Sequence, residues 1–198
     1  MTRFRLRHAA HALALLLAMA ASLPASAEGP ADNLFLRSKG TQVEAFSSEF
    51  GSGWEASNLT PASTDFDASG QPVRDLVWSS ASMAPFPHWV LFRFEKPTWF
   101  THFVFDNYLA EEPDHPGISA RAVELWVGDA PDALRRIASF ELRKNERGQR
   151  FAVEPVQTSY IRLVVVSNYG HPWYTELGAT QAFDDGTRPP ADEAVDAR

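Results

Sequence analysis

The sequence predicts an all-β fold in which about eight strands form an antiparallel sandwich of two sheets. Apolar and polar residues alternate with a period of two in several segments, which is typical of strands with one buried face. β-Branched and aromatic residues are frequent in these segments, and Pro, Gly, Asn and Asp separate them. Ten of the 14 prolines lie between Pro61 and Pro172, which leaves no room for a long helix. Short strands with turn signals between them favour a sandwich.

The clearest alternation lies in four segments. In HWVLFRFE, for example, Val90, Phe92 and Phe94 fall on one face and can enter a core together. Only PDALRRI, at 131–137, is suited to a helical turn. The expected strands are, in order, 41–46, 76–79, 88–95, 99–107, 121–128, 136–142, 149–154, 159–168 and 174–183.

The composition excludes several classes of protein. Of the 198 residues, 44% are hydrophobic and 12% are aromatic, which is enough for a large core and too much for a disordered chain. The chain has no cysteine, so disulfides, thiol catalysis and thiolate metal sites are excluded. The formal net charge of −7 repels phosphates at long range, so we expect neither nucleic acid nor an anionic membrane surface as a partner.

The composition also divides the chain into four segments. Residues 1–27 have a basic start, a run of Ala and Leu and a small-residue end at Ala27, which predicts a cleaved signal peptide. The alternative, an uncleaved anchor, is disfavoured because the apolar run is short for a bilayer. Three of the 18 basic residues lie there, so the cleaved chain has 15 basic and 25 acidic residues, a net charge of −10. We expect a lead-in at 28–33, one domain at 34–183, and a disordered acidic tail at 184–198.

The order of several motifs resembles a discoidin domain, also called a coagulation-factor type C domain. The motifs are GWEASNL (53–59), WS (78–79), PHWVLF (87–92), AVELWVGD (122–129), YIRLVV (160–165), SNYG (167–170) and TEL (175–177). Together they span about 34–183, the length of a whole domain of this type. The resemblance implies an eight-stranded jelly roll of the galactose-binding-like superfold, a fold shared by family 32 carbohydrate-binding modules. This agrees with the periodicity of the strands.

The resemblance also implies a place for a structural cation, although the sequence departs from the family there. Thr60-Pro61 and an insertion, ASTDFDASGQPVRD, replace the family's Asp-Gly turn. Asp65 and Asp67 in the insertion are candidate calcium ligands, together with Glu176, whose position matches a carboxylate ligand of related sugar-binding modules. Calcium needs about six to eight oxygen ligands. We therefore favour the alternative, in which Asp65 and Asp67 are solvated and Glu176 caps a turn.

No pattern indicates catalysis. The sequence contains neither a Gly-x-Ser-x-Gly nor a His-Glu-x-x-His motif. Nothing in it places two carboxylates together as an acid and base pair, and His88, His102, His115 and His171 are scattered singly. We therefore do not expect an enzyme, and calcium is the one possible cofactor.

The loop after segment 159–168 combines aromatic rings with polar side chains. A sugar packs its C–H face on a ring, while its hydroxyls bond to planar groups such as those of Asn, His, Glu or Arg. In family 32 carbohydrate-binding modules this loop contributes such a ring, which by position implies Tyr169 or Trp173 here, with Asn168 and His171 beside them. The alternative is that both rings cover the end of the barrel.

These observations predict an extracytoplasmic module, periplasmic or secreted, that binds carbohydrate through loops at one end of the sandwich. The alternative is a protein–protein or adhesion module that uses the same loops. Met83 and Phe86 are candidates for insertion into lipid, but such insertion normally works with a basic patch, which the acidic mature chain does not favour. We expect a monomer whose partner is a glycan or an extracytoplasmic protein.

Overall fold

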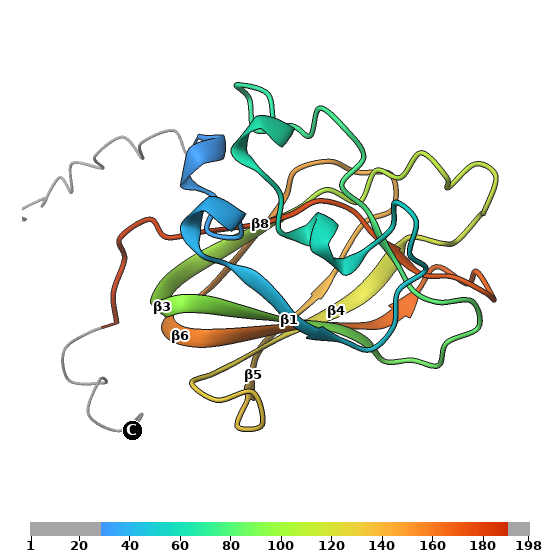
Figure 1. The fold of residues 1–198 in the computed structure, drawn as a ribbon. Coiled ribbons are helices and arrows are strands. Elements are labelled where there is room, and N and C mark those ends of the chain that lie inside the picture. Colours follow the sequence, from blue (N-terminus) through green and yellow to red (C-terminus); the bar gives the residue numbers. More distant parts are fainter. Residues whose placement is uncertain (1–28, 190–198) are drawn as a thin grey trace, which may run out of the picture.

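The computed structural model describes residues 29–189. The predicted signal peptide, residues 1–27, and residues 190–198 of the predicted tail lie outside this range. Within residues 29–189, no helix is long and apolar enough to cross a membrane. This part of the chain consists mainly of strands, loops and short 3₁₀ helices (Figure 1).

The elements follow the order expected for an all-β chain. The 3₁₀ helices are η1 (Pro30–Asp32), η2 (Arg37–Lys39), η3 (Ala56–Leu59) and η4 (Ser63–Asp65). The strands are β1 (Gln42–Phe46), β2 (Trp78–Ser79), β3 (His88–Phe105), β4 (Ala120–Gly128), β5 (Arg135–Glu141), β6 (Gln149–Asn168), β7 (Glu176–Leu177) and β8 (Thr180–Phe183).

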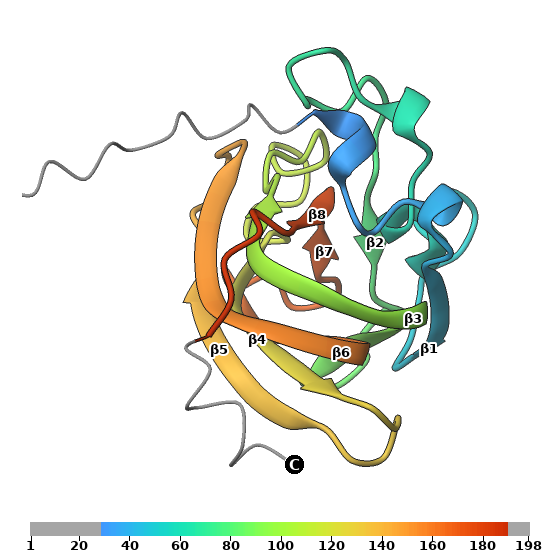
Figure 2. The ribbon, with the colours of Figure 1, turned by 90° about the vertical axis from the view of Figure 1, so that its left-hand side faces the viewer.

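The strands form two antiparallel sheets, which confirms the predicted fold class. The larger sheet has the order β1-β3-β6-β4-β5, with β8 paired to β3, and the smaller sheet consists of β2 and β7. The first half of β3 lies between β1 and β6, whereas its second half lies between β6 and β8. Figure 2 shows β3 and β6 curving along the molecule, with β2, β7 and β8 on the inner side of that curve.

Four of the expected strands join into the two long strands β3 and β6. Each of these contains a proline, Pro97 or Pro155, that we expected to separate two strands. The β3–β6 ladder shifts register between Arg93 and Thr98, and again after Phe100. Because proline has no amide hydrogen to donate, the ladder bulges past each proline and then resumes.

Two local expectations were wrong in detail. The segment PDALRRI forms a turn and then enters β5 at Arg135, and Ile137 packs against the core from that strand. The segment 174–183 forms two strands, β7 and β8, instead of one. Gly178 separates them and approaches the Asp106 carbonyl oxygen so closely that a Cβ would lie 2.0 Å from it. Only glycine fits this position without displacing the backbone.

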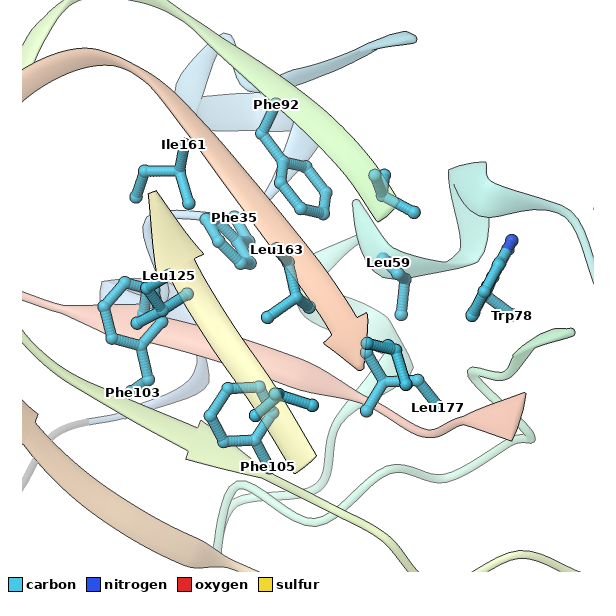
Figure 3. Close-up of a cluster of buried hydrophobic side chains, with 14 of the residues drawn as sticks. Phe35, Leu59, Trp78, Phe92, Phe103, Phe105, Leu125, Ile161, Leu163 and Leu177 are labelled. Carbon is cyan, nitrogen blue, oxygen red and sulfur yellow. The ribbon is translucent and has the colours of Figure 1, made fainter. Parts of the chain in front are cut away.

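Aromatic rings fill much of the core (Figure 3). Phe35 stacks on Phe92 with 4.6 Å between ring centroids, and its edge meets Phe103 at 6.0 Å. Trp78 is fully buried and donates its indole N–H to the carbonyl of Ser48 at 3.0 Å. This close-packed core gives the loops at the ends of the strands a rigid base.

Both ends of the predicted domain contact the sandwich. The side-chain oxygen of Asn33, in the predicted lead-in, accepts a hydrogen bond from the backbone of Ala182 at 3.1 Å. Arg188, in the predicted tail, pairs with Asp184 at 2.8 Å and lies 4.4 Å from the centre of the Trp99 ring.

Candidate functional site

Four loops meet at one end of the sandwich, toward the right-hand side of Figure 1. They are residues 47–55, 80–87, 106–119 and 169–175. Backbone hydrogen bonds join these loops and the short strands beside them: Phe50 N to Ser79 O, Ser80 N to Thr175 O, Met83 N to Trp173 O, His171 N to Gly117 O and Glu176 N to Ile118 O. The loops therefore form one connected surface, and their side chains keep fixed relative positions.

The loops enclose a pocket of about 190 Å³ with aromatic walls. The Phe50 ring meets the Trp54 ring edge-on at 5.7 Å and the Tyr174 ring edge-on at 5.5 Å. Polar side chains lie between these apolar walls. We call this pocket the loop-end site; its lining residues are Phe50, Trp54, Ser79, Glu111, His115, Ile118, Tyr174 and Glu176.

Two histidines hold the Tyr174 wall in place. His171 stacks on the Tyr174 ring at 5.8 Å, and its Nδ1 accepts the Tyr174 amide at 3.1 Å. His115 meets the edge of His171 at 5.6 Å. The Trp173 ring lies edge-on to His171 at 6.0 Å and is 56% exposed. Because these rings are already ordered, a ligand that contacts them loses little affinity to side-chain ordering.

Glu176 supplies an unusual carboxyl group to the floor of the site. Its side chain is only 3% exposed, and its Oε2 has no hydrogen-bond partner among residues 29–189. Burial raises the pKa of Glu176 to about 7, and the charges of Glu111, Glu112 and Asp75 add to the rise against an opposing hydrogen bond with Ser79. Glu176 is therefore partly protonated at neutral pH, which lowers the negative charge of the site.

Glu112 organises the loop that carries Glu111 and His115. It is 5% exposed, and its Oε1 accepts the Gly117 amide at 2.7 Å. Its Oε2 accepts both the amide, at 3.1 Å, and the hydroxyl of Ser119. Burial alone would raise the pKa of Glu112, but the hydrogen bonds from Ser119, Gly117 and Lys144 outweigh it and lower the pKa. The ionised form of Glu112 therefore holds the loop closed on itself.

The structure separates the four predicted ligand residues into two pairs. The Asn168 amide donates to the carbonyls of His171 and Tyr174, at 2.9 and 3.0 Å, so it braces the loop. The Tyr169 hydroxyl donates to the Leu142 carbonyl at 2.6 Å, so this ring is tied down at the end of the sheet. His171 contacts the Tyr174 wall and Trp173 lies beside it. Direct contact of these four side chains with a ligand stays a prediction.

The three predicted calcium ligands do not come together. Asp65 pairs with Arg74 through two hydrogen bonds of 2.7 and 2.9 Å, which lowers its pKa. Asp67 accepts the amide and the hydroxyl of Ser69 within its own loop. The carboxylates whose charges affect the pKa of Glu176 are Glu111, Glu112 and Asp75, and neither Asp65 nor Asp67 is among them. Among residues 29–189, no group of three or more His, Asp or Glu side chains is arranged to hold a metal ion. Asp65, Asp67 and Glu176 therefore do not form the predicted calcium site among the described residues. Whether the protein binds calcium elsewhere stays a prediction.

Two walls of the loop-end site were not predicted from the sequence. Trp54 and Trp78 were used above only as parts of the motifs GWEASNL and WS; in the structure Trp78 lies in the core, whereas Trp54 lines the pocket. Phe50 was not considered, although a large apolar residue between polar and glycine neighbours was a usable signal. It is 49% exposed, which is unusual for a ring without a role at the surface.

No protein-family model matches the sequence, and no curated protein sequence matches it. Solved structures do match the fold. The chitosan-binding module 1 of a chitosanase/glucanase from Paenibacillus sp. IK-5 is 17% identical, with a TM-score of 0.54 over 77% of this chain and 98% of that one. A fragment of a putative chitobiase from Bacteroides thetaiotaomicron is 19% identical, with a TM-score of 0.57 over 73% and 89% of the two chains.

A third similar structure is the family 32 carbohydrate-binding module from Streptococcus pneumoniae EndoD. It is 16% identical to this chain, with a TM-score of 0.56, and the match covers 77% of this chain and 99% of that one. At such identities the likeness establishes the fold. The chain has the discoidin-like jelly roll of these modules, as the motif order implied.

Proposed function

We propose that the protein is a non-catalytic carbohydrate-binding protein that acts outside the cytoplasm and holds its glycan in the loop-end site. The observation that carries this proposal is the pocket itself. Phe50, Trp54 and Tyr174 offer apolar ring surface, and hydroxyl, imidazole and carboxyl groups lie between them. A pyranose presents apolar C–H faces and polar edges, so it needs this combination of surfaces. The chitosan-binding activity in the name of one structural neighbour supports the same class of ligand.

The charges of the site favour a glycan with amino groups. Glu111 and Glu176 line the pocket, and Asp75 lies in an adjoining hollow of about 180 Å³ that shares both glutamates. An ammonium group near these carboxylates would favour the ionised form of Glu176. We therefore take chitosan oligosaccharides as the first probe, with their N-acetylated counterparts as the neutral comparison.

The placement of the acids supports the proposal of binding without hydrolysis. A glycosidase needs two carboxyl groups that flank the scissile bond. Glu176 has the raised pKa of a general acid, but its side chain is 3% exposed and presents little surface to a substrate. It adjusts the charge of the pocket from beneath the ligand. We expect no release of reducing sugar from any oligosaccharide that binds.

Phe50→Ala should weaken binding of a chitosan tetramer about tenfold, since truncating an aromatic anchor costs roughly 1–3 kcal/mol of binding free energy. The fold should survive, because the ring is half exposed. Phe46→Ala is the matched control: it removes the same side chain, 40% exposed, from β1, outside the lining of the loop-end site. Isothermal titration calorimetry measures the affinity of both variants for the tetramer. If Phe50→Ala and Phe46→Ala bind it equally well, the ligand does not bind in the loop-end site.

Trp173→Ala measures how far the site extends along the loop. If the sugar reaches Trp173, this variant should also lose about tenfold in affinity, with little change in melting temperature because the ring is exposed. A glycan array with the wild-type protein tests the proposal as a whole. Binding to a protein partner without binding to any glycan would favour the adhesion module instead.

A further inference from the structure

A second hollow lies on the outer face of the large sheet, where the end of the loop 80–87 lines one edge of it. It has a volume of about 480 Å³ and crosses β3, β6 and β4. We call it the outer-face groove; its main lining residues are Phe86, Trp89, Glu124, Trp126, Arg162 and Val166. None of its lining residues belongs to the loop-end site. Phe86 and Val166 are 44% and 41% exposed, so two of its apolar side chains face solvent.

The register of the sheet places the two tryptophans on either side of Arg162. Leu91 and Trp126 are the residues paired with Arg162 on β3 and β4, and Trp89 precedes Leu91 by two positions on the same face. The strands that carry Trp89 and Trp126 are separated by β6, so their axes lie about 10 Å apart. Arg162 therefore lines the groove between two aromatic side chains, and its side chain is half-buried there.

Arg162 is held in position without a carboxylate partner. Its guanidinium carbon lies 5.0 Å from the centre of the Trp89 ring, and one terminal nitrogen donates to the Pro131 carbonyl at 3.1 Å. Its Nε is shielded from solvent and has no acceptor among residues 29–189. The neighbouring carboxylate, Glu124, is already taken up by Arg136 at 2.6 Å and by the Trp126 indole at 2.9 Å. The groove therefore holds a fixed cation that forms no ion pair with a carboxylate of residues 29–189.

We propose that the outer-face groove binds an acidic saccharide, with a uronate carboxylate on the Arg162 guanidinium and the C–H face of a pyranose ring on Trp126. A planar guanidinium that is already oriented forms paired hydrogen bonds with a carboxylate at little entropic cost. The ring surface beside it suits a sugar better than a free anion. The proposal is independent of the ligand in the loop-end site, because the two sites share no residue.

The acidic charge of the chain does not prevent this binding. The net charge, −7 for the full sequence and −10 after the expected cleavage, repels an acidic polymer at low salt, but at physiological ionic strength charges beyond about 8 Å are largely screened. The contact with Arg162 is within that distance and stays effective. Affinity for a uronate oligosaccharide should therefore depend on the local contact, and it should be lost when the carboxylate is esterified.

The test uses trimers of galacturonate and of mannuronate, each compared with its methyl ester, which keeps the rings and removes the charge. Titrations followed by the indole N–H signals in nuclear magnetic resonance spectra report on Trp89 and Trp126 directly. We expect at least one acidic trimer to shift these signals at millimolar concentration or below, and its ester to bind at least tenfold more weakly. If neither acidic trimer binds, or if each ester binds as well as its acid, the proposal is wrong.

Two variants locate the interaction. Arg162→Gln should weaken binding of the acidic trimer at least tenfold, whereas Arg93→Gln, which removes an arginine paired with Glu44 on the same sheet, should not change it. Trp126→Leu gives an independent check if Arg162→Gln does not fold, since it removes the ring and its hydrogen bond to Glu124 and keeps the Arg162 cation. Phe50→Ala should leave uronate binding intact, so failure here is distinguishable from failure at the loop-end site. Unchanged uronate affinity in the folded Arg162→Gln or Trp126→Leu variant would overturn the assignment.

Discussion

Glu112→Ala should lower the free energy of unfolding by about 3–5 kcal/mol, because it removes a buried carboxylate that accepts hydrogen bonds from two backbone amides and pairs with a lysine. The amides of Gly117 and Ser119 would lose their acceptor inside the protein, and the ammonium of Lys144 would lose an ion pair of 3.1 Å. An unpaired buried donor costs about 1–3 kcal/mol. For a domain of this size the melting temperature should fall by roughly 10 °C.

Glycan binding should fall together with stability in Glu112→Ala. The loop that Glu112 closes carries Glu111 and His115, and both line the loop-end site. Glu111→Ala is the matched control: it removes the neighbouring carboxylate, which lines the pocket, and should change stability by less than about 1 kcal/mol. Thermal denaturation and calorimetric titration of both variants separate the two roles. A Glu112→Ala protein as stable as wild type would contradict the role given to these hydrogen bonds.

The fold was predictable because each strand carries its own signal. Alternation places Val123, Leu125 and Val127 on one face and Trp126 on the other, and the structure buries the first three and leaves Trp126 lining the outer-face groove. What alternation does not show is where a strand ends. Pro155 ends a strand by local rules, yet β6 continues through it, because β6 itself bulges at the proline and its pairing with β3 then resumes.

The loop-end site was only partly predictable for a different reason. Its walls come from residues far apart in the sequence, such as Phe50 and Tyr174, and their contact depends on how loops dock on one another. The loop 169–175 lies at this end of the molecule, and its contact with a ligand stays a prediction. The roles within it were not predictable, since a sequence does not show that the Asn168 amide and the Tyr169 hydroxyl are already occupied by backbone carbonyls.

Titration of Glu176 should lower the stability of the protein as the pH rises from about 4.5 to 7. In the folded protein burial raises the pKa of Glu176 to about 7, from an ordinary value of 4.5. In this pH range the unfolded chain has already released the proton and the folded chain retains it. The free energy of unfolding therefore decreases with rising pH, by about 3 kcal/mol in total for a difference of this size. Below pH 4.5 both states are protonated and this loss is absent.

Glu176→Gln should remove this dependence, because the amide stays neutral at every pH. The variant should be more stable than wild type at pH 8 and should lose that advantage at pH 4. Glu154→Gln, which neutralises an exposed carboxylate on β6, should keep the wild-type slope. Urea denaturation between pH 4 and 8 measures all three proteins. Parallel pH profiles for wild type and Glu176→Gln would show that Glu176 is not the group that titrates. The same two proteins test calcium: if calcium binds Glu176, added calcium at pH 8 should stabilise wild type and not Glu176→Gln.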